Sequence, residues 1–154
     1  MSVKGGRIGL STALVRAAFL VNGAYAENSR EFGISSQQGQ LLCCLRAQPF
    51  GMGDLSVVLG LAKSTVTGLV NNLERDGLVR READFHDSRA VSVALTEHGR
   101  EVADGFYTRT KRQIEQFPAS LTPAELETLT GLLARVAQDN NVSAIFMEID
   151  PADA

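Results

Sequence analysis

Residues that could bind nucleic acid are concentrated between positions 63 and 75. Their side chains carry hydroxyls, amides and cations, and they share one side of a helical repeat. They are Lys63, Ser64, Thr65, Thr67, Asn71 and Arg75. Such groups pair with base edges and donate hydrogen bonds to phosphates. The spacing therefore predicts a helix face that contacts double-stranded DNA, and the alternative is an ordinary solvated face.

Residues for catalysis or metal binding are sparse by comparison. The two histidines, His86 and His98, have no sequence partners that suggest a metal site. The sequence also lacks a glycine-rich phosphate loop and a nucleophile motif. We therefore expect neither an enzyme nor a bound metal or cofactor.

The helix that would present the polar face has a clear apolar side. Val66, Leu69, Val70 and Leu73 recur at helical spacing, and Gly77 is a natural stop. This pattern predicts a helix over residues 63–76 that packs by one side only.

A shorter helix is expected just before it. Asp54 is its predicted cap, Leu55 and Leu59 are among its apolar members, and Gly60 ends it. Residues 60–62 then form the tight turn of a helix-turn-helix. Ala62 lacks the polar side chain that usually caps the second helix of such a unit.

Two short strands follow the longer helix. Residues 78–82 and 90–95 are predicted as strands, with a polar turn over 83–89 between them. A helix followed by a β-hairpin is a winged-helix pattern, although any α+β domain can contain an amphipathic helix and a hairpin. Of Arg80 and Arg81 we expect one to contact a phosphate, and we favour Arg81.

The N-terminal third is predicted to contain two helices. The first covers residues 8–27, with a wide apolar face, and is broken at 28–33. Ser35 and Gln38 form a capping box for the second. Residues 50–53 are then expected to form a loop.

Two more helices are expected after the hairpin. Thr96 caps one over residues 97–116, and Thr122, followed by proline, begins another that ends at 139–141. Residues 142–149 form a short apolar segment, either a helical turn or a strand. The first and last helices are more apolar than one small domain needs, which predicts an obligate dimer interface. The alternative is that they simply cover the helix-turn-helix.

The length and the charge distribution of the chain limit its domain organisation and the way in which it could bind DNA. The chain has 154 residues and a net charge of −3, and we expect a single domain over 1–154. Residues 1–51 carry +3, residues 52–95 carry −1 and residues 96–154 carry −5. DNA affinity must therefore come from local placement of cations. Because no apolar run reaches about 18 residues and no signal peptide is recognisable, we expect a cytoplasmic protein without a membrane partner.

The two cysteines are adjacent. Neighbouring residues on a helix point about 100° apart, so a disulfide between Cys43 and Cys44 is implausible. We expect one of them to be buried as a small apolar residue and the other to lie nearer the surface. The alternative is a redox-sensing thiol.

These elements, in this order, resemble the MarR family of bacterial transcriptional regulators. The resemblance is dense from about residue 34 to residue 100, and it covers the terminal helices only in pattern. Its motifs are Ser-Thr-Val-Thr at 64–67, Gly-Leu-Val at 77–79, Asp-x-Arg at 87–89 and Leu-Thr-x-x-Gly at 95–99. Their combination at these intervals is specific.

The resemblance implies a mainly α fold with a small β-hairpin, a winged helix-turn-helix. Its DNA-binding lobe would cover residues 34–100, and residues 1–30 and 101–154 would supply dimerisation helices. The helix at 63–76 would enter the major groove of an inverted-repeat operator. In the wing, Arg89 would reach the minor groove and Asp87 would orient it.

A ligand-responsive repressor acting as a homodimer is the implied function. Members of the family often bind small phenolic or other aromatic ligands, or sense oxidants, and release DNA in response. The redox branch carries its thiol near the start of the chain, where this sequence has none. Candidate lining residues for an effector pocket between the first, second and fifth helices are Arg16, Phe19, Tyr25, Cys43 and His98. Singly, each fits an ordinary core or surface position.

Three positions depart from the family pattern. Gly68 and Asn72 stand where basic residues are common, and Ser88 replaces a second arginine at the wing tip. Each change removes a phosphate or base contact. A winged-helix protein-interaction module with weakened or lost DNA binding is therefore the alternative function.

Overall fold

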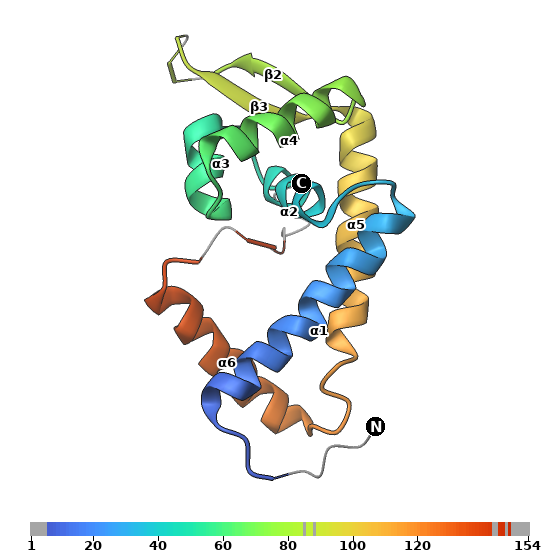
Figure 1. Cartoon of the computed structure of the whole chain (residues 1–154), viewed down its shortest axis with the longest axis vertical. Coiled ribbons are helices and arrows are strands. Elements are labelled where there is room, and N and C mark those ends of the chain that lie inside the picture. Colours follow the sequence, from blue (N-terminus) through green and yellow to red (C-terminus); the bar gives the residue numbers. More distant parts are fainter. Residues whose placement is uncertain (1–5, 85, 88, 143–144, 147, 149–154) are drawn as a thin grey trace.

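The computed structural model describes residues 6–84, 86–87, 89–142, 145–146 and 148 of the chain. Within them it contains six helices and three strands (Figure 1). In chain order they are α1 (Leu10–Glu31), α2 (Ser36–Leu45), β1 (Phe50–Gly51), α3 (Met52–Leu59), α4 (Lys63–Arg75), β2 (Val79–Ala83), β3 (Val91–Leu95), α5 (Glu97–Glu115) and α6 (Pro123–Asp139). The predicted fold class is confirmed.

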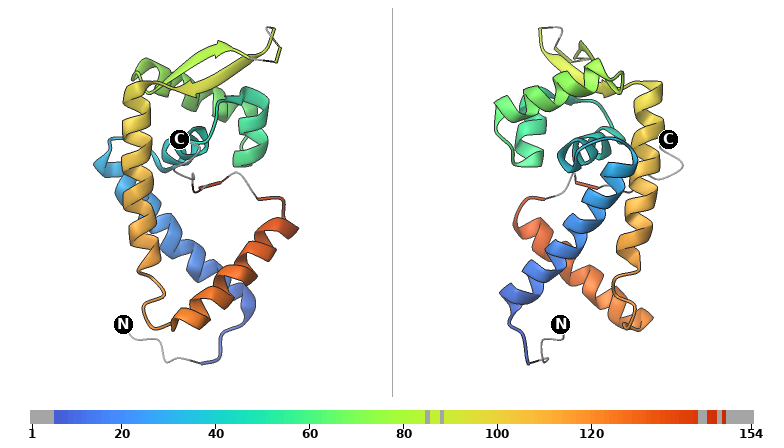
Figure 2. Two further views of the ribbon diagram at one scale, coloured as in Figure 1. Left: turned by 180° about the vertical axis from the view of Figure 1, so that it is seen from behind. Right: turned by 45° about the vertical axis from the view of Figure 1, so that its right-hand side comes forward.

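The winged helix occupies one end of the molecule. Figures 1 and 2 show α2, α3 and α4 gathered under the β2–β3 hairpin, and α5 running from the hairpin toward the other end. There α1 lies alongside α5, and α6 turns back at the end farthest from the hairpin. The end that contains α3, α4 and the hairpin is thus separated from the apolar faces of α1 and α6.

The sheet is antiparallel, with β3 between the other two strands. Val79 of β2 lies opposite Leu95, so the two predicted strands are confirmed to within about a residue at each end. The predicted loop at 50–53 is wrong, because Phe50 pairs with Val93 as a short edge strand and α3 begins immediately afterwards. Two residues beside a strand edge carry too little pattern to be recognised as a strand.

A single apolar core holds α2, α3, α4 and the sheet together. Val66, Val70 and Leu73 of α4 are fully buried in it, as their spacing predicts, and Leu69 is partly buried at its edge. Fully burying a side chain of this size contributes about 1.5–3 kcal/mol, so three of them hold α4 firmly against α2 and α3. The rest of α4 is left to solvent.

The predicted helix starts are mostly confirmed. Ser35 Oγ accepts from the backbone N–H of Gln38 at 3.1 Å, and the Gln38 side chain accepts from the N–H of Ser35 at 2.9 Å. Thr122 forms the same box with Glu125, and Thr96 caps α5. These hydrogen bonds satisfy donors that the first helical turn leaves unpaired.

Two predicted helix boundaries are wrong. The first helix does not break at Asn28, because the buried Asn28 amide donates 2.9 Å hydrogen bonds to the carbonyl of Ala24 and to Gln113 Oε1 of α5. The helix continues to Glu31 and the chain turns at Gly33, which has a φ of 69°. Asp54 does not cap α3; Gly51 is its N-cap, and Asp54 lies in its first turn.

Two glycines of α5 allow it to pack closely. A Cβ on Gly99 would lie 1.7 Å from the carbonyl oxygen of Leu78, and one on Gly105 would lie 3.0 Å from the Phe32 ring. Glycine in a helix interior costs about 1 kcal/mol relative to alanine. Here the cost is offset by contact between α5, the start of the wing and the end of α1.

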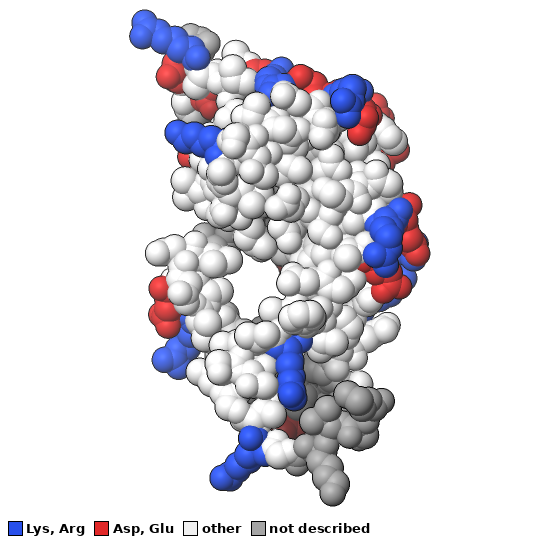
Figure 3. All heavy atoms as spheres, viewed as in Figure 1, with Lys and Arg blue, Asp and Glu red and all other residues white. Residues whose placement is uncertain are grey.

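The terminal helices leave a large apolar surface uncovered. No residue of α6 is buried, and Leu129, Leu132, Leu133 and Val136 are all exposed. On α1, the exposed apolar residues are Leu10, Leu14, Val15, Phe19 and Leu20. Figure 3 also shows an opening through the molecule between α6 and the rest of the chain. The alternative that these helices merely cover the helix-turn-helix is therefore wrong for α6.

Residues beyond α6 are described only in part. Ile145 packs against the main core, and Phe146 lies 4.5 Å from Tyr107 between ring centroids. Neither residue lies in a helix or strand. The remainder of the predicted apolar segment lies partly outside the described residues.

Candidate nucleic-acid interface

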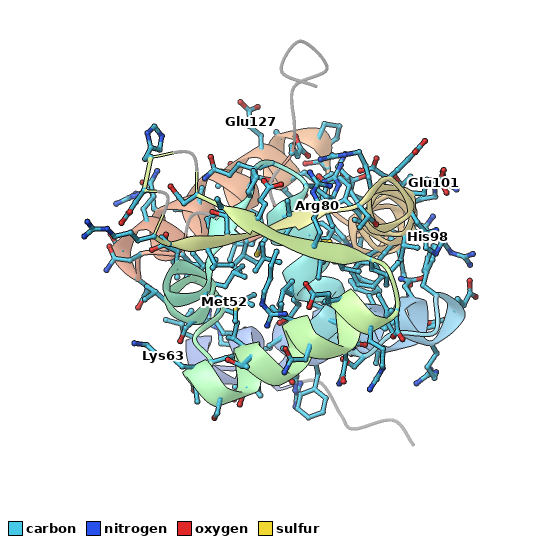
Figure 4. The ribbon with its side chains drawn as sticks, turned by 90° about the horizontal axis from the view of Figure 1, so that it is seen from above. Met52, Lys63, Arg80, His98, Glu101 and Glu127 are labelled. Carbon is cyan, nitrogen blue, oxygen red and sulfur yellow. The ribbon has the colours of Figure 1, made fainter. Side chains whose placement is uncertain are left out.

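The outer face of α4 carries the predicted DNA-contacting residues. All six of them on this helix are exposed: Lys63, Ser64, Thr65, Thr67, Asn71 and Arg75. Figure 4, which looks onto this end of the molecule, shows Lys63 at the start of α4, with the hairpin beside the helix. Ala62 provides no side-chain cap, as expected, so the first N–H groups of α4 remain available to an anion.

Arg81 lies on β2 but is bound to α4. Its Nη1 donates to Glu74 Oε1 and its Nη2 donates to Asn71 Oδ1, both at 2.7 Å. The backbone N–H of Arg81 also donates to Glu74 at 3.3 Å. The guanidinium therefore ties the wing to the helix and holds the Asn71 amide with its oxygen turned inward. This link was not predictable from the sequence, because Arg81 and Asn71 belong to different elements.

Arg75 and Arg80 also have partners in the structure. Arg75 Nη2 donates to Asn72 Oδ1 at 3.1 Å, and its Nε lies 3.9 Å from an Asp76 carboxylate oxygen. Arg80 donates to Glu82 at 3.0 Å and to the carbonyl of Leu95 at 2.7 Å. Exposed pairs of this kind contribute about 0–1 kcal/mol, so Arg75 can exchange its partner for a phosphate at low cost.

The wing tip is organised by two aspartates. Asp84 accepts hydrogen bonds from the backbone N–H groups of His86 and Asp87 and from the Ser92 hydroxyl, and these bonds lower the pKa of its carboxyl. Asp87 accepts from the backbone N–H of Arg89 at 3.0 Å. Asp87 thus positions Arg89 through the backbone. Asp84 was missed by sequence reasoning, although an aspartate at the start of a polar turn commonly plays this role.

Few of the described cations at this end lack an ion pair. In Figure 3 the surface over α4 is largely uncharged, and Lys and Arg side chains stand at the wing tip and at the ends of the helix. Among the described residues, no ion pair is recorded for Lys63 or for Arg89, which lies exposed in the turn. Ser88, the third departure from the family pattern, lies outside the described residues.

The five candidate effector residues do not converge. Tyr25 and Cys43 are buried together in a small aromatic cluster with Phe106 and Tyr107. Arg16 is exposed, and Phe19 is 76 % exposed on α1. His98 is an exposed neighbour of Glu101 on the first turn of α5, on the opposite side of Figure 4 from Lys63. Within one chain, the expected pocket is thus limited to Tyr25 and Cys43.

A cationic side chain completes this cluster. The Arg46 guanidinium lies 3.7 Å above the centre of the Tyr107 ring, and its Nε donates to Asp104 at 2.8 Å. The Arg46 side chain is only 11 % exposed, so the stacking on Tyr107 occurs away from bulk water, where such contacts are strongest. Sequence reasoning missed Arg46 and Tyr107, because a pair formed by α2 and α5 leaves no local pattern.

Both cysteines are buried, contrary to the expectation that one lies nearer the surface. Cys44 faces the main core and Cys43 faces the aromatic cluster, because α2 is enclosed on both sides. Burial raises the pKa of Cys43 to about 12 and that of Cys44 to about 11. The thiols are therefore protonated and unreactive at neutral pH.

An open groove of about 730 Å³ runs beside the aromatic cluster. Val21 and Tyr25 of α1, Val58 of α3 and Ile145 and Phe146 of the segment after α6 contribute to its walls. It lies between the winged helix and the apolar terminal helices. The Phe146 ring also lies 5.8 Å from the Tyr25 ring and 4.5 Å from the Tyr107 ring, between centroids.

Other kinds of site were also sought in the described part of the chain. It contains no group of three or more His, Cys, Asp or Glu side chains that could hold a metal ion. It also contains no single helix long and apolar enough to cross a membrane. Only α3 and α4 taken together reach that length and hydropathy, across a bend of 112°.

Comparison with known proteins agrees with this geometry. Residues 32–90, which include α2 to the wing tip, match the model described as MarR family. The HTH-type transcriptional regulator YdgJ of Bacillus subtilis is 30 % identical over 73 % of this chain and 70 % of its own length. The structure of apo wild-type MarR from Escherichia coli superposes with a TM-score of 0.74, at 25 % identity, over 86 % of this chain and 98 % of the other.

The chain belongs to the MarR family. This MarR-family chain is also similar to the homoprotocatechuate degradative operon repressor of Escherichia coli, with 26 % identity over 80 % of this chain and 84 % of the relative. The relatives are transcriptional regulators, and the winged helix-turn-helix is the fold that they share with it.

Proposed function

We propose that this chain is a ligand-responsive transcriptional repressor that binds an inverted-repeat operator as a homodimer in the cytoplasm. One observation carries the proposal. The outward face of α4 consists of exposed hydroxyl, amide and basic side chains, while its opposite face is fully buried in the core. A helix held this way presents its polar side to the major groove, and the exposed Arg89 in the wing is placed to approach the neighbouring minor groove.

Dimerisation is supported by the terminal helices. The exposed leucines and Val136 of α6 and the apolar side of α1 lie at the end of the molecule opposite the hairpin. A monomer seldom exposes a continuous apolar surface on two helices. A second copy of the chain, packed on these helices, would bury about 2,000 Å² or more and would set two α4 helices one DNA turn apart.

A small aromatic effector is supported by the groove and its aromatic wall. Tyr25 and Phe146 line the groove, and Tyr107, on which Arg46 stacks, lies against Phe146. The aromatic wall suits a flat ring. The relative named for a homoprotocatechuate operon is linked by its name to an aromatic acid. The groove lies between the DNA-binding end and the dimer helices, so a ligand there can alter the distance between the two α4 helices.

The charge balance favours a second candidate. Arg81 is paired with Glu74 and Arg80 with Glu82, and Gly68 and Asn72 supply no cation, so the DNA-binding end has few unpaired positive groups. A winged-helix interaction module that docks on a protein would tolerate this composition. It would also leave the polar face of α4 without a role.

A gel shift separates the two candidates. The wild-type chain is titrated against DNA from around its own gene, against a random duplex of equal length, and against both in the presence of an aromatic acid such as homoprotocatechuate. The repressor predicts retention of its own DNA at lower protein concentration than the random duplex. Equal or absent retention of both duplexes would favour the interaction module.

A further inference from the structure

Gly68 stands in the middle of α4, where the fold does not require a glycine. It is exposed, its φ is not positive, and a Cβ added to it would meet no heavy atom within 4 Å. Apart from proline, glycine is the least favourable residue in a helix interior. Alanine would therefore stabilise α4 without any contact being disturbed, and the presence of glycine needs another explanation.

At several other positions the fold does require a glycine. Gly33, Gly60 and Gly77 have positive φ values, which other residues rarely adopt. At Gly39 and Gly99 a Cβ would collide with Phe106 or with the Leu78 carbonyl. These five glycines are explained by the chain's own structure, and Gly68 is not. Gly23, Gly53 and Gly131 are equally open helical positions, so what distinguishes Gly68 is its place among the candidate DNA-contacting residues of α4.

Gly68 occupies the outermost line of the helix. At 100° per residue it lies about 170° around the axis from the centre of the stripe formed by Val66, Val70 and Leu73. Ser64 precedes it by one turn and Asn71 follows it by nearly one turn, so the three share one outward strip. This strip is the part of α4 that would face the floor of the groove.

The neighbours of Gly68 have short side chains. A serine or asparagine reaches a base edge only if the helix backbone itself comes close to the groove floor. Asn71 is restricted further, because Arg81 holds its Oδ1 at 2.7 Å and the amide would have to break this bond to swing outward and compensate for a greater distance. Any side chain at position 68 would be the first group to touch the floor and would hold both neighbours away.

We propose that Gly68 is a close-approach position that sets the depth of α4 in the major groove and thereby the sequence preference of the protein. This inference rests on the proposed DNA binding. The Cα of Gly68 contacts base-pair edges, which allows Ser64 and Asn71 to form direct hydrogen bonds with them. A basic residue at position 68 would provide a phosphate contact. Glycine gives up that contact, and the protein gains sequence preference instead.

The test uses the full-length protein with Gly68→Ala. The operator is first selected from a random duplex pool by the wild type, and binding is measured by fluorescence anisotropy on that operator and on a random duplex. We expect Gly68→Ala to melt at a higher temperature than the wild type and yet to bind the operator at least about tenfold more weakly. Random DNA, bound through phosphates, should be affected less than about threefold.

Gly131→Ala is the matched control. Gly131 also lies in a helix interior with nothing within 4 Å of an added Cβ, about 150° around α6 from its apolar stripe. This variant should gain thermal stability in the same way and bind both duplexes as the wild type does. Gly68→Arg provides a second variant, and it should bind random DNA more tightly while losing the preference for the operator.

Each outcome has one meaning. If the wild type selects no operator, the proposed function fails, and the inference fails with it. If the wild type selects one and Gly68→Ala binds it within about twofold of the wild type, the repressor proposal stands and the close-approach role is wrong. A parallel loss of operator binding in Gly131→Ala would also overturn the inference, because the effect would then follow from helix stiffness.

Discussion

Arg81 Nη2 donates a 2.7 Å hydrogen bond to Asn71 Oδ1, and this bond joins the wing to the middle of α4. An asparagine that reads adenine uses both its oxygen and its NH₂ group. Here the oxygen is engaged by Arg81 and the NH₂ group is left to donate. If α4 enters the major groove as proposed, we expect Asn71 to meet an acceptor, such as guanine O6 or N7 or thymine O4.

The first prediction concerns Arg81→Lys. Lysine keeps the charge but cannot bridge Glu74 and Asn71 with a planar fork, so the Asn71 amide should become free to rotate. We expect the difference in binding free energy between operator and random DNA to decrease by about 1 kcal/mol or more. The salt dependence of binding should not change.

Fluorescence anisotropy at several salt concentrations measures both quantities. In an Asn71→Ala background the same lysine substitution should have little further effect, because the two residues act as a unit. If Arg81→Lys behaves as the wild type on both duplexes, Arg81 acts as a plain phosphate contact.

Arg89→Ala tests the wing. Arg89 is exposed, its backbone N–H is held by Asp87, and no ion pair is recorded for it among the described residues. Its loss should weaken binding to operator and random DNA alike and reduce the salt slope by about one phosphate equivalent. Arg135→Ala on α6, which also removes one exposed cation, is the control and should change neither. Unaltered affinity of Arg89→Ala on both duplexes would favour the interaction-module candidate.

Gly99→Ala should unfold the protein more easily. The added Cβ would lie 1.7 Å from the Leu78 carbonyl oxygen, so the start of α5 or the start of the wing must move. Overpacking of this kind costs about 1–3 kcal/mol, and backbone on both sides makes the upper end the expected value. Urea denaturation at fixed protein concentration measures it. Gly131→Ala should shift the midpoint in the opposite direction, and a Gly99→Ala midpoint at or above the wild-type value would contradict the packing.

Leu132→Lys should prevent the proposed dimer from forming. Leu132 is 52 % exposed in the apolar stripe of α6, and a charge buried there in the proposed dimer would have no partner. Glu127→Lys introduces the same side chain on the far side of α6, so this control should remain dimeric. Sedimentation velocity at micromolar concentration distinguishes the two species. A wild type that sediments at the mass of one chain would show that the terminal helices serve another purpose.

The burial of the two cysteine thiols predicts how the protein responds to oxidants and to high pH. The pKa of Cys43 is raised by burial from 9.0 to about 12, so the folded state retains a proton that the unfolded state loses above about pH 9. Stability should therefore be unaffected by these groups at neutral pH and should fall as the pH rises from 9 toward 12. Reaction with a thiol reagent at pH 7 should require unfolding, and peroxide should leave DNA binding unchanged. Loss of DNA binding on mild oxidation that a thiol reverses would disprove this.

The sequence predicted the local structure of the winged helix well, because its signals are local. The apolar stripe of α4, the capping boxes at Ser35 and Thr122 and the alternating strand at 91–95 each depend on residues within one element. Asn28 shows where such reasoning fails. An asparagine usually interrupts a helix, but here Gln113, 85 positions away, satisfies its amide.

The exposure of the candidate DNA-contacting residues was predictable, but the contacts between them were predictable only in part. The exposure of Lys63, Ser64 and Thr67 follows from helical spacing alone. The link from Arg81 to Asn71 and the stacking of Arg46 on Tyr107 join separate elements, which a single sequence does not place together. The effector candidates proved to be scattered for the same reason. Phe19 and His98 are exposed, and neither belongs to the cluster that contains Tyr25.

α5 is anchored at both ends, and this makes it a lever. Its first turn is fixed to the wing through Gly99 and Thr96 against Leu78, and its last turns are fixed to α1 through Gln113 and Asn28. A rod of 19 residues is about 28 Å long, so a tilt of about 10° at the α1 end displaces the wing end by about 5 Å. That displacement exceeds the 3.4 Å rise of about one base pair. In the proposed dimer, a small pivot between the subunits would therefore be enough to move both α4 helices out of register with the half-sites of the proposed operator.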